Sequence, residues 1–274
     1  MKFGVSTFIT DQGISPISLG TALEERAFDS LFIAEHSHIP VNRRSPYPGG
    51  GELPDIYYRT LDPFVALTAI GVVTERLLLG TGIALIPQRD PIITAKEVAS
   101  LDLVSGGRVI FGVGVGWNRE EMRDHGTDPA TRGRLTDERL RAMRELWTEE
   151  KAEFHGEFVD FDPAFAWPKP VQRPHPPIYV GGGEGAFRRV AQLGDAWLAN
   201  GVPPQELGPQ IERLRALADR EVPVTVYGIP DDPEQIEGYR GLGVERVLFY
   251  LPTMPERETR EYLDRLTEIT ARFR

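Results

Sequence analysis

Short apolar runs alternate with amphipathic stretches along the whole chain. The apolar runs lie at 2–8, 30–36, 76–86, 108–116, 176–182, 195–201, 222–229 and 244–251. Stretches with helical periodicity follow them, at 16–28, 62–74, 91–105, 131–150, 184–194, 204–220, 233–243 and 256–273. Continuous apolar runs are typical of strands buried on both faces, and alternation with helices favours parallel pairing. The pattern therefore predicts eight strands, each followed by a helix.

Eight such units predict a closed (β/α)8 barrel, the TIM-barrel fold, with residues 1–274 as a single domain. The competing arrangement is a doubly wound open sheet, which usually carries a nucleotide-binding loop after its first strand. That position reads "ITDQGISP", so we favour the barrel. Two segments fall outside the alternation, at 36–61 and 151–175. We expect them to be loop insertions after strands two and four.

The charge and composition exclude several classes of function. A net charge of −10 argues against nucleic acid or an anionic membrane as a partner. The chain has no cysteine, so disulfides and thiolate metal sites are excluded. No window approaches about 18 uninterrupted apolar residues, and the N-terminal apolar run is too short for a signal peptide. We expect a cytoplasmic protein that acts on a small molecule.

Glycines are concentrated where three predicted strands end. The fourth strand runs into "GGRVIFGVGVGWNREE", in which Gly112, Gly114 and Gly116 recur at every second position. Glycine weakens a strand, and period two directs all three toward one side. Strand three runs into "GTGIALIPQRDP" and strand five into "GGGEGAF". The pattern indicates a ligand that approaches closely, or small residues that merely fit the taper of the barrel.

The glycines after strand five are a candidate anion cradle. Gly181, Gly182 and Gly183 lead into a predicted helix, whose first amides have no partner within the helix. Strand seven instead ends in the acidic "YGIPDDPEQ", which would repel phosphate. We therefore expect a phosphate group to bind after strand five.

Arginines gather near the ends of strands two and three. Arg43, Arg44 and Arg59 lie in the loop after strand two, and Arg89 follows strand three. Guanidinium groups suit carboxylates and phosphates, so the cluster could receive the anionic tail of a cofactor or substrate. A solvated loop is the alternative.

Two histidines and a glutamate follow the second strand in "EHSHIP". A His-x-His pair suggests zinc, but a zinc site needs further ligands from later strands. Strand eight ends in "LFYLPTM" without a carboxylate, so we expect no metal. Either His36 or His38 could instead brace the loop.

The polar residues after strand four fit the start of a helix. Asn118 is a good helix N-cap and Glu121 follows three residues later, which predicts a capping box. Trp117 either packs in the core or lines a pocket wall.

Five motifs occur in order along the chain: "SLFIAEHSHIP", "PYPGGGELPDIYYRTLDPFVALTAIG", "LLLGTGIALIPQRDPIITAKEVASLD", "SGGRVIFGVGVGWNREEM" and "PPIYVGGGEGAFRRVAQLGDAWLANG". As a set they resemble the bacterial luciferase-like monooxygenase superfamily, within it the branch of F-420-dependent oxidoreductases. The resemblance covers nearly the whole chain and is strongest over 30–122. It implies a luciferase-like (β/α)8 barrel, often a homodimer, that holds FMN or the deazaflavin coenzyme F-420 in its C-terminal mouth.

The resemblance also implies site residues. A bulge in strand three presses on the ring through a non-prolyl cis peptide, which maps to Gly82-Ile83. The family histidine matches His36, and backbone after strands four and five holds the ribityl chain and phosphate. The strand-four glycines would then leave room for the cofactor. The implied cofactor-binding residues are His36, Thr81, Gly82, Ile83, Gly114, Gly116, Trp117, Asn118, Gly181, Gly182 and Gly183.

These observations predict hydride transfer between F-420 and a small organic substrate. His36 is the predicted catalytic residue, with Glu35 expected to set the tautomer of its imidazole. Val115 stands where sugar-phosphate dehydrogenases of the F-420 group carry a catalytic Glu, so a sugar phosphate is not favoured. The phosphate and glutamates in the F-420 tail would suit the arginines.

Three alternatives remain open. The first is a two-component monooxygenase that uses reduced FMN and oxygen, the second a non-catalytic flavin-binding protein, and the third a metal-dependent hydrolase. We expect 37–60 and 151–175 to form the substrate side of the mouth, unless their aromatic residues only pack the loops. These are Tyr47, Tyr57, Tyr58, Phe165 and Trp167.

Overall fold

Eight parallel strands form one closed barrel in the computed structural model, which describes residues 1–273. They are β1 (Lys2–Thr7), β2 (Ser30–Ile33), β3 (Leu78–Thr81), β5 (Val109–Gly114), β8 (Ile178–Gly181), β9 (Ala196–Asn200), β10 (Val224–Ile229) and β11 (Arg246–Tyr250). Each pairs with its neighbour in chain order, and β1 pairs with β11 to close the ring. The predicted TIM-barrel fold is confirmed.

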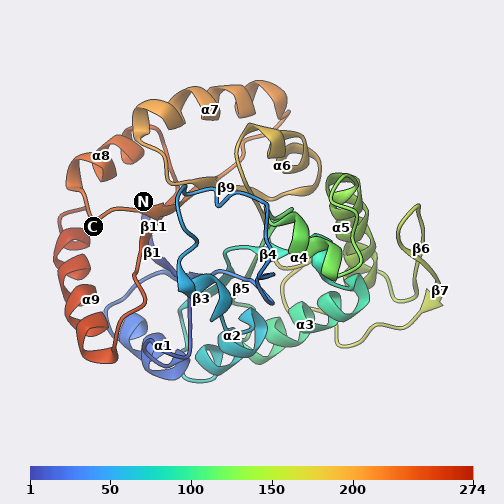
Figure 1. Ribbon diagram of the computed structural model, residues 1–274, viewed down its shortest axis with the longest axis horizontal. Coiled ribbons are helices and arrows are strands. Elements are labelled where there is room, and N and C mark those ends of the chain that lie inside the picture. The colour runs from blue at the N-terminus through green and yellow to red at the C-terminus, as the bar shows by residue number, and fades with distance from the viewer. Residues whose placement is uncertain (274) are drawn as a thin grey trace.

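Helices surround the barrel (Figure 1). They are α1 (Pro16–Glu25), α2 (Pro63–Gly71), α3 (Pro91–Val104), α5 (Arg132–Thr148), α6 (Phe187–Leu193), α7 (Pro204–Leu217), α8 (Pro233–Gly241) and α9 (Glu256–Ala271), and a short α4 (Arg119–Asp124) precedes α5. Proline begins several of them, where its missing N–H costs no hydrogen bond. Asp62 and Asp90 cap α2 and α3 by accepting from backbone amides. Every described helix is too short or too polar to span a bilayer.

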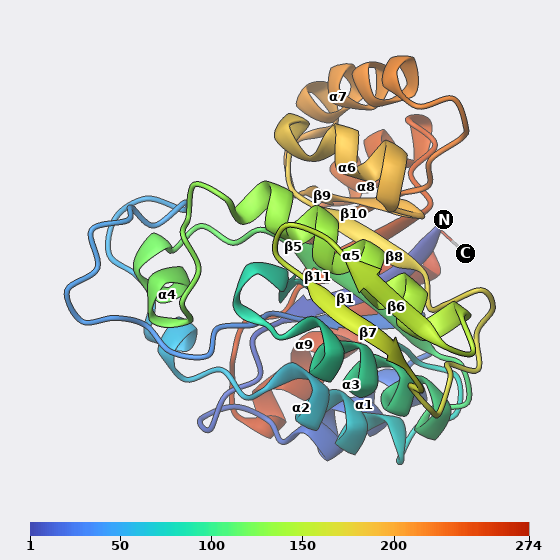
Figure 2. The same cartoon turned by 90° about the vertical axis from the view of Figure 1, so that its right-hand side faces the viewer.

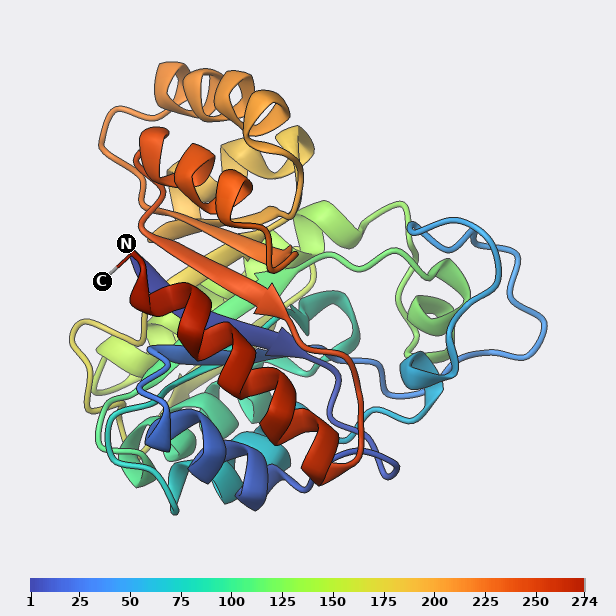
Figure 3. The same cartoon turned by 90° about the vertical axis from the view of Figure 1, so that its left-hand side faces the viewer.

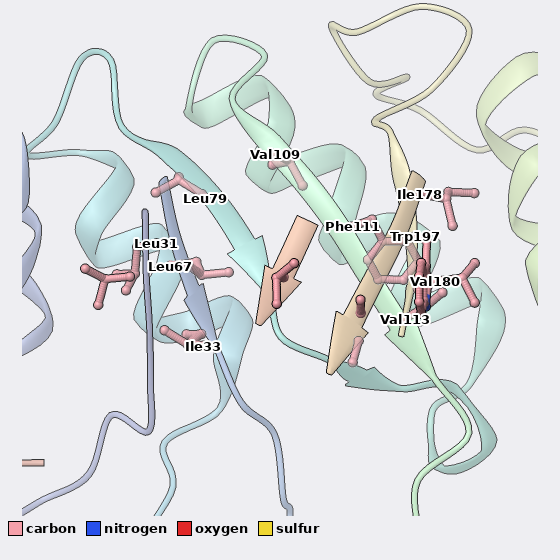
Figure 4. Packing of buried hydrophobic residues seen from close by; sticks show 14 of the residues in the cluster. Leu31, Ile33, Leu67, Leu79, Val109, Phe111, Val113, Ile178, Val180 and Trp197 are labelled. Atoms are coloured by element: carbon pink, nitrogen blue, oxygen red, sulfur yellow. The ribbon is translucent and has the colours of Figure 1, made fainter. Parts of the chain in front are cut away.

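The hydrophobic core has two layers, because successive strand residues point to opposite sides. Leu31 and Ile33 of β2 face outward and meet Leu67 of α2 in the larger cluster, between barrel and helices (Figure 4). Phe32 faces inward, into a smaller cluster that fills the barrel interior. Burial on both faces explains why the strands read as continuous apolar runs.

The amino end of the barrel is closed by a buried ion pair. Arg246 is 1% exposed, and its Nε lies 2.6 Å from Asp29 Oδ2. Its guanidinium also donates to the Tyr179 hydroxyl at 3.2 Å. These contacts fill the amino end, so we look for a ligand site at the other end of the barrel.

The long loop after β2 lies at the carboxyl end. The arrowheads of β1 and β11 point toward this loop and α4, whereas both termini lie at the opposite end (Figure 3). The loop includes one 3-10 turn, η1 (Asp55–Tyr58). The first predicted insertion thus overhangs the mouth.

The second insertion lies elsewhere. It contains an antiparallel hairpin, β6 (Ala152–His155) and β7 (Asp160–Ala164), on the outer side of α3 and α5 (Figure 2). Its predicted mouth residues Phe165 and Trp167 contact the ammonium groups of Lys151 and Lys169 instead. Their assignment to the substrate side is wrong. The 17 residues of α5 carry the chain about 25 Å back toward the amino end first.

The third barrel strand is interrupted. β3 pairs with β5 as far as Gly80, and a two-residue strand, β4 (Ala84–Leu85), resumes the pairing further along. Between them the chain bulges inward, and Thr81 Oγ1 donates to the Gly112 carbonyl at 2.6 Å. The Thr81 carbonyl lies so close to Gly112 that a Cβ there would overlap it. Gly112 is therefore required by the bulge.

Alanine at position 112 tests this close approach. We expect Gly112→Ala to lower the free energy of unfolding by about 2 kcal/mol or more, because backbone atoms rather than a flexible side chain must move. Urea denaturation measures the change. Gly241→Ala in α8 is the control, since its methyl would meet no atom within 4 Å. An unchanged urea midpoint for Gly112→Ala would contradict this account.

Candidate active site

The bulge places Ile83 at the floor of the mouth. The peptide bond between Gly82 and Ile83 is cis, as the resemblance implies. A Cβ at Gly114 would overlap the Ile83 side chain, and one at Gly181 would lie 2.8 Å from Ile83 Cγ2. The space left by these glycines is thus filled by Ile83, which corrects the expectation that it is left for a cofactor. A ligand in the mouth would rest on the bulge instead.

Gly116 differs from the glycines before it. It lies beyond β5 with φ of 68°, a left-handed conformation that favours glycine. The predicted period of two therefore ends at Gly114, and the chain turns at Gly116 toward Trp117 and α4.

His36 forms a buried pair with Glu121. Its Nδ1 lies 2.8 Å from Glu121 Oε2, and the two side chains are 5% and 0% exposed. The backbone N–H of Ser37 donates to Glu121 Oε1 at 3.2 Å. A buried carboxylate needs donors, and these two supply them. Since the carboxylate accepts, Nδ1 carries a proton and Nε2 is the nitrogen left to face a ligand.

Glu35 does not orient His36. Its Oε1 lies 2.5 Å from Arg89 Nη2, and its Oε2 accepts from the Leu85 amide at 2.6 Å. Successive side chains of extended backbone point to opposite sides, so Glu35 faces β4. The expectation that Glu35 sets the imidazole tautomer is wrong, and Glu121 takes that place.

The contact between Glu121 and His36 shows that the predicted capping box is only half formed. Asn118 does cap α4, accepting from the Glu121 amide at 3.4 Å. The Glu121 carboxylate, however, turns to His36 rather than back to Asn118. The Asn118 side chain is almost fully buried, and its Nδ2 has no hydrogen-bond partner among the described residues. Buried donors are normally paired, so an acceptor group of a ligand could take the hydrogen bond that the Asn118 Nδ2 group is able to donate.

Aromatic rings wall the mouth beside His36. The rings of Tyr57 and Trp117 lie 5.2 and 5.8 Å from its imidazole. Tyr47 packs edge-on to both of them, at 5.2 and 6.2 Å. Of the predicted substrate-side tyrosines, Tyr57 thus lies next to His36, and Tyr47 packs against Tyr57 and Trp117. Tyr58 is mostly exposed and contributes to a different groove.

Two further tyrosines were missed from the sequence. Tyr227 of β10 packs over Gly82, where a Cβ would lie 2.6 Å from its Cε2. Tyr250 ends β11 and is half-buried. Burial raises the pKa of Tyr57, Tyr227 and Tyr250, so these phenols stay neutral near pH 7. Their inward positions in apolar strands were the available signal.

The predicted anion cradle has a modified geometry. A 3-10 turn, η3 (Glu184–Ala186), stands between the glycines and α6. The Gly182 carbonyl accepts from Trp197 Nε1 at 2.6 Å, and its φ of 121° favours glycine. A Cβ at Gly183 would meet nothing within 4 Å. The backbone at Gly183 therefore borders open space.

The four predicted arginines separate into two groups. Arg59 pairs with Asp11 at 2.9 Å and Arg89 with Glu35, so both serve the scaffold. The Arg43 guanidinium stacks 5.3 Å from the Trp117 ring centre. Arg44 lines a groove at the rim of the mouth.

The two histidines after β2 have separate carboxylate partners. His36 pairs with Glu121, and His38 pairs with Asp124 at 3.0 Å.

Comparison with known proteins gives the family. The model of luciferase-like monooxygenases matches residues 2–230. The chain belongs to the luciferase-like monooxygenase family. An uncharacterized protein of Mycobacterium tuberculosis is 41% identical over 97% of both chains. An FMNH2-dependent dimethylsulfone monooxygenase of Pseudomonas putida is 36% identical over 47% of this chain and 36% of its own length.

Solved structures share the luciferase-like barrel. The monooxygenase RslO1 from Streptomyces bottropensis superposes with a TM-score of 0.82 and 20% identity, covering 100% of this chain and 99% of its own. An F420-dependent secondary alcohol dehydrogenase, in complex with an F420-acetone adduct, gives 0.75 and 19%, covering 98% of each chain. At these identities the likeness establishes the fold alone.

Removing the Glu121 carboxylate tests its hold on His36. We expect Glu121→Ala to cost about 1–3 kcal/mol of unfolding free energy, because it leaves the buried Nδ1 of His36 and the Ser37 amide without their acceptor. The imidazole should also shift toward its Nε2–H tautomer, which NMR of the histidine ring nitrogens resolves. Asp124→Ala is the matched control, since its exposed carboxylate pairs only with the exposed His38 among its described side-chain contacts. Identical His36 spectra in wild type and Glu121→Ala would disprove the assigned contact.

Proposed function

We propose that this luciferase-like protein transfers a hydride between coenzyme F-420 and a small organic substrate in the barrel mouth. The observation that carries the proposal is the buried His36–Glu121 pair, placed beside an inward bulge and an aromatic wall. It leaves one ring nitrogen of His36 for a ligand, in a mouth that the rings of Tyr57 and Trp117 wall on one side. Such a mouth suits a flat heterocycle with a polar edge.

The residues of the mouth fit a ring with a phosphorylated side chain. Ile83 and Gly82 would form the floor under the ring, and the unpaired Asn118 amide would meet a polar group of the ligand. The open backbone at Gly183 would receive the phosphate. When bound, a deazaflavin supplies the carbon that accepts or releases the hydride.

The protein's own contribution is positioning and proton handling. His36 Nε2 would exchange a proton with the reacting oxygen of the substrate or with the polar edge of the cofactor ring. Glu121 would keep the imidazole in the orientation that makes Nε2 available, as a positioning residue. The neutral tyrosines exclude water and add no competing charge, and holding the reactants together lowers the barrier further.

A second candidate is a monooxygenase that uses reduced FMN and oxygen. It is supported by the relative from P. putida and by the fold shared with RslO1. The same floor, wall and cradle would serve FMN, which also carries a ring and a phosphate. Arginines beside the mouth favour F-420, whose tail is more anionic.

Cofactor titration tests this order. We expect F-420 to bind with a micromolar Kd, read from its fluorescence, and FMN to bind more weakly. Gly183→Leu would fill the open space at the cradle and is expected to weaken F-420 binding about ten-fold or more. Gly241→Leu, with equally open surroundings in α8, is the control. Micromolar binding of FMN without binding of F-420 would reverse the order of the two candidates.

We also propose that the protein is a homodimer through the outer face of α2 and α3, which pack side by side (Figure 2). Alongside Lys96 of α3, this face exposes six apolar residues, whereas α9 exposes charged ones. They are Val65, Val72, Ile92, Ile93, Leu103 and Val104. A face of this kind matches one side of a dimer interface, typically about 800 Å².

A charge on this face should separate the subunits. We expect Val65→Glu/Val72→Glu to convert a dimer to a monomer in analytical ultracentrifugation, because two glutamates would be buried without partners. Val41→Glu is the control, since Val41 is fully exposed in the mouth loop. A wild-type protein that sediments as a monomer at high concentration would refute the interface.

A further inference from the structure

We propose that a groove on the rim of the mouth binds an anionic chain with two or more carboxylate or phosphate groups. The groove encloses about 510 Å³ between the loop at 44–48, the turn at Gly116 and the starts of α4 and α5. The proposal rests on the proposed function, because it takes the mouth to hold the ring of the same ligand or of its partner in the reaction.

The groove concentrates positive charge in an acidic protein. Four arginines line it, supplied by the loop, by α4 and by α5: Arg44, Arg119, Arg123 and Arg132. The whole chain carries a net charge of −10. A local excess of the opposite sign, between low-dielectric walls, attracts anions more strongly than scattered surface arginines do.

Glu120 is the one acidic residue among those that line the groove, and it is already engaged. Its Oε2 accepts from the Ser45 amide at 3.2 Å, and Arg123 donates to its Oε1 at 3.4 Å. Hydrogen bonds from Ser45 lower the pKa of Glu120, so it stays ionised and cancels one positive charge. Three arginines then remain without compensation within the groove, which matches a ligand with several negative groups.

The groove joins the mouth at Trp117. This side chain lines the groove, and its ring lies 5.8 Å from the His36 imidazole. The Arg43 guanidinium covers Trp117 at 5.3 Å, which continues the positive rim toward the mouth. A ligand seated beside His36 can therefore extend past Trp117 to the arginines.

The groove is separate from the cradle at 181–183, which follows a different strand. One phosphate in the cradle would leave the arginines unused, so the groove calls for additional anionic groups. Guanidinium forks bind carboxylates and phosphates in the same geometry. Those groups can belong to the glutamate tail of the cofactor or to a separate anionic substrate.

A double variant tests the groove. In Arg44→Gln/Arg119→Gln, which leaves the Arg123–Glu120 pair intact, we measure binding of F-420 with its glutamate tail, of the same coenzyme without glutamates, and of a free tetraglutamate peptide. The control is Arg257→Gln/Arg265→Gln, which removes equal charge from exposed sites on α9, across the barrel (Figure 1). We expect tailed F-420 to bind wild type about ten-fold more tightly than the tail-less form, and the double variant to lose that difference.

The outcomes separate the two sources of anion. Loss of the tail-dependent difference in the double variant alone supports the groove and assigns it to the cofactor tail. Tail-independent cofactor binding, with tetraglutamate bound by wild type and not by the double variant, supports the groove and assigns it to a separate ligand. If neither probe distinguishes wild type from the double variant, or if the control behaves alike, the groove proposal is overturned.

The proposed function can fail independently. If no form of F-420 and no FMN binds, the hydride-transfer proposal fails, while tetraglutamate still tests the groove. The tail-dependent gain in F-420 affinity and the binding of tetraglutamate should both weaken as the salt concentration rises, since salt screens the attraction of exposed arginines.

Discussion

One buried carboxylate holds the mouth of this barrel together. Glu121 is excluded from solvent, and the donors it accepts from, His36 Nδ1 and the Ser37 amide, lie at the end of β2. Without them the cost of burying its charge would be several kcal/mol. The pair therefore fixes α4 over β2, and it brings Trp117 against His36 because Trp117 directly precedes the cap of α4. The wall, the oriented imidazole and the groove all depend on this contact.

A steric constraint sets the floor of the mouth. The bulge between β3 and β4 needs space inside the barrel, and β5 and β8 provide it by having no side chain at Gly112, Gly114 and Gly181. The glycines thus make room for the Thr81 carbonyl and the Ile83 side chain of the same protein. Arg246 and Asp29 fill the amino end, and the candidate site lies at the carboxyl end.

The charge distribution around this mouth is uneven. Arg89 pairs with three carboxylates, those of Glu35, Asp62 and Glu97, and burial raises the pKa of the Tyr57 and Tyr227 phenols. Uncompensated positive charge is left only at the rim, among the described residues that line the groove. An aromatic wall beside an arginine-lined rim suits a ligand that is flat at one end and anionic at the other.

The sequence by itself determined the eight β/α units, the closed barrel, the family and the position of the mouth. Each follows from local periodicity, from motifs or from strand order. It also named His36, the Gly82–Ile83 bulge and two tyrosines, Tyr47 and Tyr57, which the structure brings to the same end of the barrel. Only the tertiary structure decided which carboxylate meets His36, because Glu121 is 85 positions away and has a sufficient local explanation as a capping residue. Likewise the position of Phe165 and Trp167 followed from the direction of α5, and the arginine groove from three segments that adjoin only in the folded chain. Side-chain direction and long-range proximity are properties of packing, and no local pattern in the sequence encodes them.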